Sequence, residues 1–419
     1  MKTLIQNGPV ITPSRIIPMG GVLIEDGKIL EILDRPMAEI SAEITEIDAA
    51  GKTISPGFVD IHVHGGAGFN FLNASPDNVN KICKAHGKFG TTSIVPTTPA
   101  APIETICDAI DNIRMAAENA TGRDGKRSHT LTVPNRDGKR SHAPTIPGPD
   151  ILGINLEGPF FSQEQRGAQP TEFIINPTQD NIEKLLDHWP GGIRMMGAAP
   201  EIEGGHNLGR ELTKRGIIAS IAHSNSTFED VERAIEFGYS DVTHIYSGCS
   251  IVHRVNAYRT AGLVEAGLYF DELTAQVISD GKHLPPSLLR LIYKCKGTDR
   301  IALISDGTEA SVSGLTDGTI FTQQNGEQFI IEDGVVMMMD RQAFAGSCAT
   351  MSRCVQNMAK IVPLLDAVKM ASQTPANVIG ARHKGRLSPG CDADIILFDK
   401  NIDVSFVMVR GQVLPFEFS

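Results

Sequence analysis

The sequence predicts an α/β protein, a (β/α)8 TIM-like barrel with a small β-sandwich domain formed from both chain ends. Three observations lead to this fold class. Eight short apolar runs alternate with helix-like segments, both chain ends carry strand-like runs, and several apolar runs end in histidine or carboxylate. Alternating strands and helices are typical of a parallel barrel, which collects its active site at the carboxyl ends of the strands. The alternative is a doubly wound open sheet.

The apolar runs supply the barrel strands. They span residues 58–64, 92–97, 151–157, 192–198, 217–223, 241–246, 273–279 and 300–306. Between them, apolar residues recur at three- and four-residue spacing in segments 78–89, 104–118, 179–189 and 227–238, as expected of amphipathic helices. Residues 56–384 are therefore assigned to the barrel.

The two chain ends have a different pattern. Asn-Gly and Asp-Gly turns separate strand-like runs in residues 1–55, and similar runs return in residues 385–419, as in β-hairpins. Neither end is long enough to bury a core of its own. We therefore expect residues 1–55 and 385–419 to pair into one small β-domain beside the barrel.

Two segments of the barrel are predicted to be insertions. Residues 120–150 contain the heptapeptide RDGKRSH twice and lack an apolar period, so they are expected to form a surface loop. Residues 319–343 alternate apolar and polar side chains around Asn-Gly and Asp-Gly, which predicts β-hairpins in the loop after the eighth strand.

Composition excludes several classes of function. The net charge of −11 argues against binding to a nucleic-acid backbone and favours a small-molecule partner. The seven cysteines form no CxxC pair, which favours reduced thiols and a cytoplasmic protein. The sequence contains no run of 18 apolar residues, so no membrane partner is expected.

Potential metal ligands lie at the ends of several predicted strands. His62 and His64 are two residues apart, so in a strand both side chains leave on the same face. Other strands end at or near a histidine or a carboxylate, and all these ends meet at one rim of a barrel. The six candidates are His62, His64, Glu157, His223, His244 and Asp306.

Histidine nitrogen and carboxylate oxygen suit zinc or another first-row divalent ion such as iron, manganese or cobalt. Two arrangements are open. Two ions would be bound by the His62/His64 pair and by His223 and His244, with Glu157 between them. A single ion would be bound by Glu157, His223 and His244, with the other pair holding a weaker second ion or none.

A family resemblance emerges at these residues. The segments PGFVDIHVHG, NLEGPF, AHSNST, VTHIY, ISDGKH, LISDGT and FAGSCATM resemble, in order, the signatures of the N-acetylglucosamine-6-phosphate deacetylase family of the amidohydrolase superfamily. The resemblance continues to SPGCDADIILFD and so covers nearly the whole chain. It implies metal-dependent hydrolysis of the acetamide of N-acetylglucosamine 6-phosphate to glucosamine 6-phosphate and acetate, in a homodimer.

The resemblance also implies roles for individual residues. Glu157, His223 and His244 match the primary metal ligands, and His62 and His64 match the pair found in members that bind two ions.

Two further residues match the family's catalytic groups. Asp306 corresponds to the general acid/base, which accepts a proton from the attacking water and delivers it to the leaving nitrogen. His283 corresponds to the histidine that contacts the substrate near the scissile amide.

The expected sugar site departs from the family pattern. The loop after His244 usually carries Asn-Ala-Met, and this chain has Ser247, Gly248 and Cys249. Where members commonly have Gly-Ala-His after LEGPF, this chain has Gln169 in place of the histidine; it can hydrogen-bond a substrate but cannot change its charge. These departures make another N-acetyl amino-sugar phosphate, such as N-acetylgalactosamine 6-phosphate, the alternative substrate.

The arginine that meets the phosphate in the family, often across a dimer interface, has two candidates here. Arg259 fits best, and His253 with Arg254 is the competing match after an apparent insertion. A guanidinium suits a phosphate because it makes paired hydrogen bonds. Ser347, which borders the active site in the family, is expected to cap the following helix or to approach the substrate.

Two other functions fit part of the sequence pattern. A cyclic-amide amidohydrolase often carries a carboxylated lysine between its metals, whereas Glu157 occupies that position here and favours the deacetylase. A non-catalytic binding protein on the same barrel would be expected to have lost ligands or Asp306, yet these residues are all present.

Overall fold

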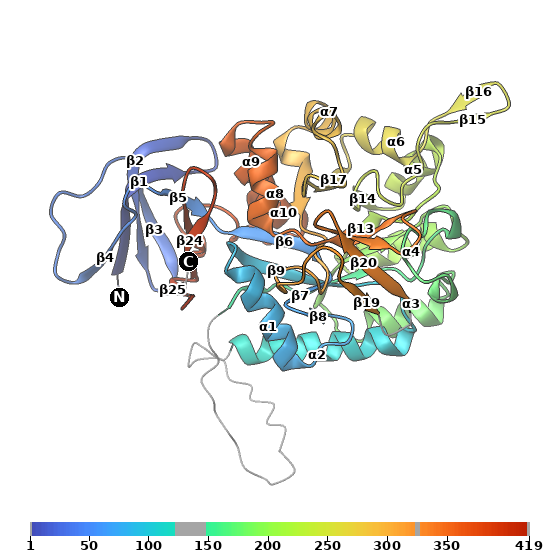
Figure 1. Cartoon of the computed structure of the whole chain (residues 1–419), viewed down its shortest axis with the longest axis horizontal. Helices are drawn as coiled ribbons and strands as arrows, with labels where there is room; N and C mark the ends of the chain where they lie inside the picture. The colour runs from blue at the N-terminus through green and yellow to red at the C-terminus, as the bar shows by residue number, and fades with distance from the viewer. Residues whose placement is uncertain (1, 122–147, 323–326, 417–419) are drawn as a thin grey trace, which may run out of the picture.

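The predicted barrel is confirmed in the computed structural model, which describes residues 2–121, 148–322 and 327–416 (Figure 1). Its strands pair in parallel in the order β9, β11, β12, β13, β14, β17 and β18, and β6 pairs with β9 on the other side. The strands are β6 (Phe58–Val63), β9 (Thr91–Thr98), β11 (Ile154–Glu157), β12 (Ile193–Ala198), β13 (Ile218–Ile221), β14 (Tyr239–Val242), β17 (Thr274–Ile278) and β18 (Ile301–Ile304).

Backbone hydrogen bonds close the barrel between its first and last strands. The amide of Asp306 donates to the carbonyl of His62 at 2.9 Å, and the amide of His64 donates to the carbonyl of Gly307 at 2.7 Å. The first and the eighth strand therefore meet at the rim where the predicted ligands lie. This closure makes neighbours of residues that are more than 200 positions apart in the sequence.

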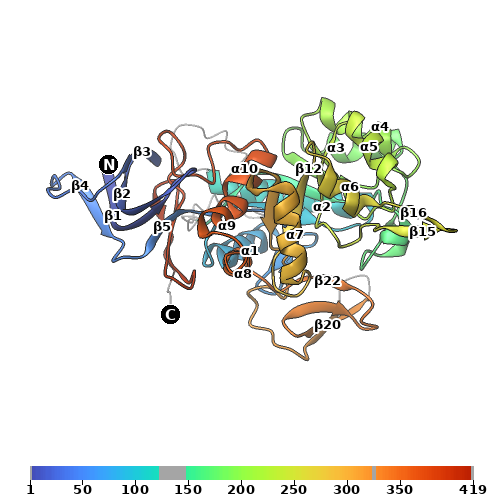
Figure 2. The same cartoon turned by 90° about the horizontal axis from the view of Figure 1, so that it is seen from above.

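Helices follow the strands and cover the outside of the barrel (Figures 1 and 2). Local signals set their starts: Ser75 caps α1 through the amide of Asn78, and Thr227 with Asp230 forms a capping box at α5. The helices are α1 (Pro76–Gly87), α2 (Ile103–Thr121), α3 (Gln179–Leu186), α4 (Gly205–Lys214), α5 (Phe228–Glu236), α6 (Leu263–Tyr269), α7 (Pro286–Lys296), α8 (Met351–Met358), α9 (Leu364–Ala371) and α10 (Gln373–Val378).

The small β-domain is also confirmed, and both chain ends contribute to it. Strand β5 (Thr53–Pro56) pairs antiparallel with β23 (Ile395–Phe398), which joins the two ends into one continuous sheet, to the left in Figure 1. Its core includes Ile5, Val22, Ile54 and Ile395. The remaining strands are β1 (Lys2–Ile11), β2 (Ile16–Glu25), β3 (Lys28–Leu33), β4 (Ile44–Asp48), β24 (Val404–Val409) and β25 (Gln412–Val413).

Several loops of the barrel contain short strands. The segment predicted as hairpins forms an antiparallel sheet, drawn in orange in Figure 2, made of β19 (Ile320–Thr322), β20 (Gln328–Glu332), β21 (Val335–Met338) and β22 (Phe344–Ser347). Further short strands are β7 (Gly65–Gly66), β8 (Phe69–Asn70), β10 (Asp150–Ile151), β15 (His253–Val255) and β16 (Tyr258–Thr260). Both copies of RDGKRSH, in the predicted 120–150 insertion, lie outside the described residues.

Within the described residues, no helix combines the length and the apolar character needed to span a membrane.

Candidate active site

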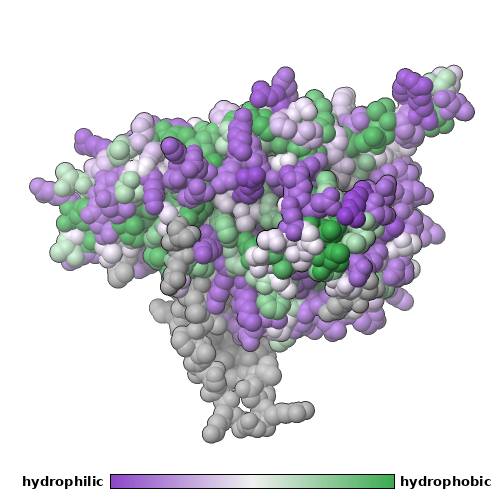
Figure 3. Space-filling model, viewed as in Figure 1, coloured by the Kyte–Doolittle hydropathy of each residue, from purple (hydrophilic) through white to green (hydrophobic). Residues whose placement is uncertain are grey.

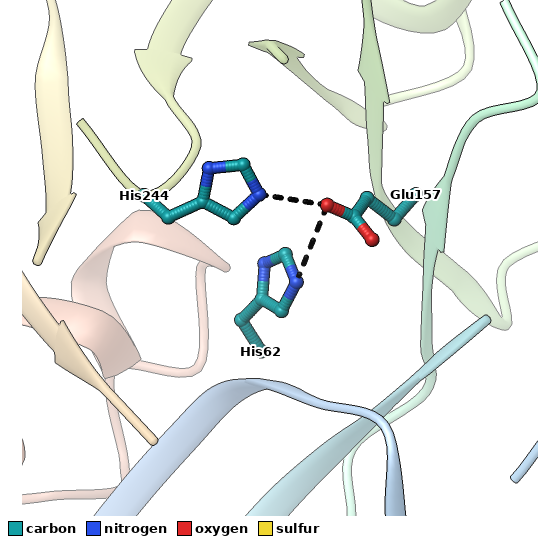
Figure 4. Close-up of side chains that lie close together, drawn as sticks. All are labelled: His62, Glu157 and His244. Carbon is teal, nitrogen blue, oxygen red and sulfur yellow. Dashed lines mark hydrogen bonds and ion pairs between the residues drawn. The ribbon is translucent and has the colours of Figure 1, made fainter. Parts of the chain in front are cut away.

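Glu157 lies at the centre of a buried cluster at the strand ends. Its Oε1 is 2.7 Å from Nε2 of His244 and 3.8 Å from Nε2 of His62 (Figure 4), and it is 3.0 Å from Nε2 of His223. Its Oε2 is 3.3 Å from Nε2 of His64. The four predicted histidines therefore converge on one carboxylate.

Asp306 faces the other side of the histidine pair. Its Oδ1 is 3.3 Å from Nε2 of His64 and 3.6 Å from Nε2 of His62. These two nitrogens are 3.3 Å apart. The structure thus brings all six predicted ligands together, with Asp306 beside the pair His62/His64.

Hydrogen bonds on the far side of the rings orient the histidines. Nδ1 of His223 donates to the carbonyl of Gln165 at 2.9 Å, and Nδ1 of His244 donates to the carbonyl of Ser247 at 3.0 Å. A proton held on Nδ1 makes Nε2, the nitrogen that points at Glu157, the one that would offer a lone pair to a metal ion in place of its hydrogen bond with Glu157. Such an arrangement is typical of metal-binding histidines.

The carboxylates stay ionised although they are buried. Burial would raise the pKa of Glu157, but hydrogen bonds from His223, His244 and His64 outweigh it and hold this pKa well below its ordinary value. Burial also acts to raise the pKa of Asp306, yet its hydrogen bond with His64 and the nearby imidazoles bring that pKa below its ordinary value. The cluster therefore presents negative charge to whatever lies between its side chains.

The pKa values of His62 and His64 shift in opposite directions. Burial lowers the pKa of His62 to about 4. Burial acts in the same direction on His64, but its hydrogen bonds to Asp306 and Glu157 prevail and raise its pKa to about 10. The point between the two carboxylates attracts positive charge, which a proton or a metal cation supplies.

Three members of the cluster have strained backbones. His223, His244 and Asp306 have φ angles of 45°, 26° and 48°, in the left-handed region that non-glycine residues seldom adopt. Strain of this kind clusters at functional sites, where the surrounding fold imposes it. It also explains a difference from the predicted strand at 241–246: β14 ends at Val242, and His244 lies in the turn that follows.

The donor set fits a divalent metal ion. His62, Glu157 and His244 each offer a ligand atom within 4.8 Å of the others, and so do His62, His64 and Asp306. Nitrogen and carboxylate oxygen donors in a buried, negatively charged cluster are the ligands that zinc and similar ions take.

The cluster opens into a cavity of about 780 Å³. Its wall includes His283, whose Nδ1 donates to Oδ2 of Asp280 at 2.8 Å and whose ring packs on Phe344 at 4.7 Å between centroids. Ser247 and Gly248, predicted to contact the substrate, also line this cavity. A small molecule bound there would lie between the carboxylate cluster and the sheet formed by β19–β22.

Gln169 lines the cavity but has another partner as well. Its Nε2 donates to Oε2 of Glu157 at 2.9 Å, and its Oε1 accepts from the amide of Ala100 at 2.9 Å. The predicted substrate contact is therefore also a contact of the central carboxylate.

The residues predicted to bind the phosphate do not line the cavity. His253, Arg254 and Arg259 are exposed on the β15–β16 hairpin, and Arg259 donates to the carbonyl of its neighbour Ala257. This hairpin stands out from the body at the upper right of Figure 3. None of the three is among the described residues that line the cavity.

The prediction that Ser347 caps the next helix is wrong. Thr350 is the N-cap of α8 and accepts from the amide of Arg353. The hydroxyl of Ser347 donates to the carbonyl of Ser305 and accepts from the amide of Ala349, and the residue is fully buried. Capping falls to Thr350 because β22 extends to Ser347 and three residues separate it from the helix.

Several residues that contact the site were missed in the sequence. Gln276 in β17 binds the ring of His62, and Glu201 accepts from the hydroxyls of Ser224 and Ser226 in the loop after His223. The signal for Gln276 was a polar residue inside the apolar run LTAQVIS, because a buried polar group requires a partner.

Comparisons with known proteins agree with the fold and the site. Residues 169–414 match the amidohydrolase family. The N-acetylglucosamine-6-phosphate deacetylase of Bacillus subtilis is 30% identical over 98% of this chain and 96% of its own. The N-acetylgalactosamine-6-phosphate deacetylase of Escherichia coli O157:H7 is 30% identical over 97% of this chain and 99% of its own.

The structure is similar to that of N-acetylglucosamine-6-phosphate deacetylase from Pasteurella multocida, with a TM-score of 0.85 and 25% identity over 99% of both chains. The barrel, the histidine and carboxylate cluster at its strand ends and these relatives together place the protein in a class, the hydrolases of amide bonds. The chain belongs to the amidohydrolase family.

Proposed function

We propose that this chain hydrolyses the acetamide of N-acetylglucosamine 6-phosphate, releasing acetate and glucosamine 6-phosphate. The observation that carries the proposal is the position of Asp306, 3.3 Å from His64 and 3.6 Å from His62, beside a set of ligands suited to a divalent ion. The names and full-length similarity of the relatives support the substrate.

Glu157, His223 and His244 would hold the first ion, and His62 and His64 would contribute to a second. We propose zinc, with iron, manganese or cobalt as alternatives that the same donors accept. When bound, such an ion polarises the amide carbonyl and lowers the pKa of a water molecule.

Side chains of the protein carry out the remaining steps. Asp306 accepts a proton from the attacking water and returns it to the amide nitrogen, because an amine leaves poorly unless it is protonated. His283, held by Asp280 on one ring nitrogen, directs the other toward the substrate and orients the acetamide. Gln169 and the loop of Ser247 and Gly248 contact the sugar. Ser347 supports the cavity wall from behind, next to the lining residue Gly346.

The phosphate is assigned to Arg259, with His253 and Arg254 as the alternative. Because these residues lie on an exposed hairpin, the assignment implies a homodimer in which the hairpin of one subunit reaches the site of the other. We also place the enzyme in the cytoplasm, as its reduced thiols suggest.

A second candidate substrate is N-acetylgalactosamine 6-phosphate. It is supported by the E. coli relative named for that activity, which is as similar to this chain as the Bacillus subtilis relative. The two sugars differ in the orientation of one hydroxyl, so the residues at the sugar site decide between them.

The test is acetate release by zinc-reconstituted protein from the two sugar phosphates, measured side by side. Higher kcat/KM on N-acetylglucosamine 6-phosphate supports the proposal. Higher kcat/KM on the galactosamine isomer moves the assignment to the second candidate. Acetate release from neither compound contradicts both.

A further inference from the structure

The ring of His62 is held differently from those of His223 and His244. Its Nδ1 lies 2.9 Å from Oε1 of Gln276, a side chain on β17. Strand β18 separates β17 from β6, so His62 and Gln276 meet through the interior of the barrel. Both side chains are fully buried.

Asp241 on β14 fixes which way the amide of Gln276 points. Nε2 of Gln276 donates to Oδ2 of Asp241 at 2.7 Å. The same carboxylate accepts from the hydroxyl of Ser220 at 2.7 Å and from the hydroxyl of Thr274. A flipped amide would set its oxygen against the oxygen of Asp241, so Oε1 is directed at His62.

The consequence for His62 is a fixed tautomer. An amide oxygen accepts and cannot donate, so Nδ1 of His62 carries the proton and Nε2 keeps its lone pair. Nε2 is the atom that faces Glu157, His64 and Asp306. The opposite tautomer would bury an unpaired amide oxygen and present a proton where a cation binds.

We infer that Gln276 and Asp241 form a positioning pair, which holds His62 in its metal-binding tautomer and thereby sets the affinity for the cation that His62 contacts. The inference rests on the proposed metal-dependent function and adds to it a determinant of metal loading. His223 and His244 use backbone carbonyls, which survive side-chain substitution, whereas the partner of His62 can be removed by one substitution.

The first test substitutes Gln276→Met, which keeps the length of the side chain and removes the acceptor. Zinc binding is measured by equilibrium dialysis with the metal content determined for each chain. We expect the affinity for the zinc ion that contacts His62 to fall about 10- to 100-fold, as for other partners of metal-binding histidines. An affinity within twofold of the wild-type value would overturn the inference.

The matched control is Thr274→Val. It removes another, partly buried hydrogen bond to Asp241 and leaves the contact between Gln276 and His62 intact. We expect reduced thermal stability with unchanged zinc affinity. An equal loss of affinity in this control would mean that general disruption of the network lowers metal binding, and would overturn the specific role of Gln276.

A double variant exchanges the amide and the carboxylate of the pair and so tests for rescue. Gln276→Glu combined with Asp241→Asn keeps an acceptor facing His62 and a donor behind it. We expect this double variant to regain the zinc affinity lost in Gln276→Met. Failure to regain it in a folded protein would count against the acceptor as the cause.

The tautomer itself is observable without any substitution at the pair. Two-bond nitrogen–proton correlation spectra of protein labelled with ¹⁵N-histidine, assigned by comparison with His62→Asn, should show His62 protonated at Nδ1. Protonation at Nε2 in the metal-free protein would refute the inference. Because neither readout uses a substrate, failure of the proposed deacetylase activity is distinguished from failure of this inference.

Discussion

Two clusters of carboxylates in the described part of the chain are neutralised in different ways. At the junction between the barrel and the small β-domain, Nζ of Lys384 lies 2.8 Å from Asp392 and 2.9 Å from Asp394, and also contacts Asp150. The side chain of Lys384 is 2% exposed. At the strand ends, Glu157 and the carboxylate of residue 306 are surrounded by imidazoles.

The difference separates a structural cluster from a functional one. An ammonium group fills the space between the junction carboxylates, although the three oxygens also have the spacing of metal ligands. In the active-site cluster the facing groups are histidine nitrogens, which bind a metal through a lone pair. The spacing of the carboxylates therefore does not distinguish the two clusters. The groups that face the carboxylates do: an ammonium in one cluster and histidine nitrogens in the other.

The largest expected effect comes from removing a ligand of the first ion. His244→Asn should lower kcat by roughly three to four orders of magnitude, because a bound metal ion contributes several kcal/mol to stabilising the transition state. Acetate release and zinc content are the measurements. His206→Asn, on helix α4, is the control and should retain both; normal zinc content in the His244 variant would contradict its role as a ligand.

Breaking the junction cluster should affect stability instead. Lys384→Met removes the ammonium that faces the buried Asp394, while Asp392 keeps Lys28 and Asp150 keeps Arg410, and we expect a cost of about 3–5 kcal/mol of unfolding free energy. Zinc content per folded chain should not change. Denaturant unfolding measures the first quantity, and a loss of zinc in this variant would show that the two clusters are not independent.

The same variant has a predictable pH dependence. Burial already raises the pKa of Asp394 to about 6 in the folded protein, and loss of the ammonium raises this pKa further. The folded variant then binds more protons than the unfolded chain, so its stability rises as the pH falls from about 7 toward 5. The deficit relative to wild type should shrink over this interval; a constant deficit would contradict the prediction.

Asp306→Asn should separate catalysis from metal binding. The amide cannot accept a proton, so kcat should fall by about a hundredfold to a thousandfold, within the range for a general acid/base. Zinc at Glu157, His223 and His244 should remain. Retained turnover in the zinc-replete variant would remove Asp306 from its proposed role.

The smallest expected effect is stabilisation by metal. Zinc at a free concentration 100 times its dissociation constant should raise the unfolding free energy by about 2.7 kcal/mol, since it binds the folded state. Thermal unfolding with and without zinc measures this. The increase should persist in Lys384→Met and vanish in His244→Asn. The reverse pattern would mean that zinc binds at the junction cluster and not at the strand ends.

Periodicity and strand-end chemistry predicted the barrel and the clustering of six histidine and carboxylate side chains at its rim. Successive strands of a barrel present their carboxyl ends at one rim, so a histidine at such an end has a predictable location. Gln276 was not predicted because the partner of a buried side chain depends on the register between strands. Ser347 was misread because the local sequence did not reveal where β22 ends and α8 begins.

The sequence by itself determined the order of strands and helices, the pairing of the chain ends into a second domain, and the residues that can bind a metal. These properties depend on local patterns of polarity and on the chemistry of each side chain. Tertiary structure alone decided that Gln169 contacts Glu157, that Gln276 orients His62, and that Lys384 neutralises residues 150, 392 and 394. These contacts join positions far apart in the chain, and only the closed barrel and its packing against the small β-domain bring them within hydrogen-bonding distance.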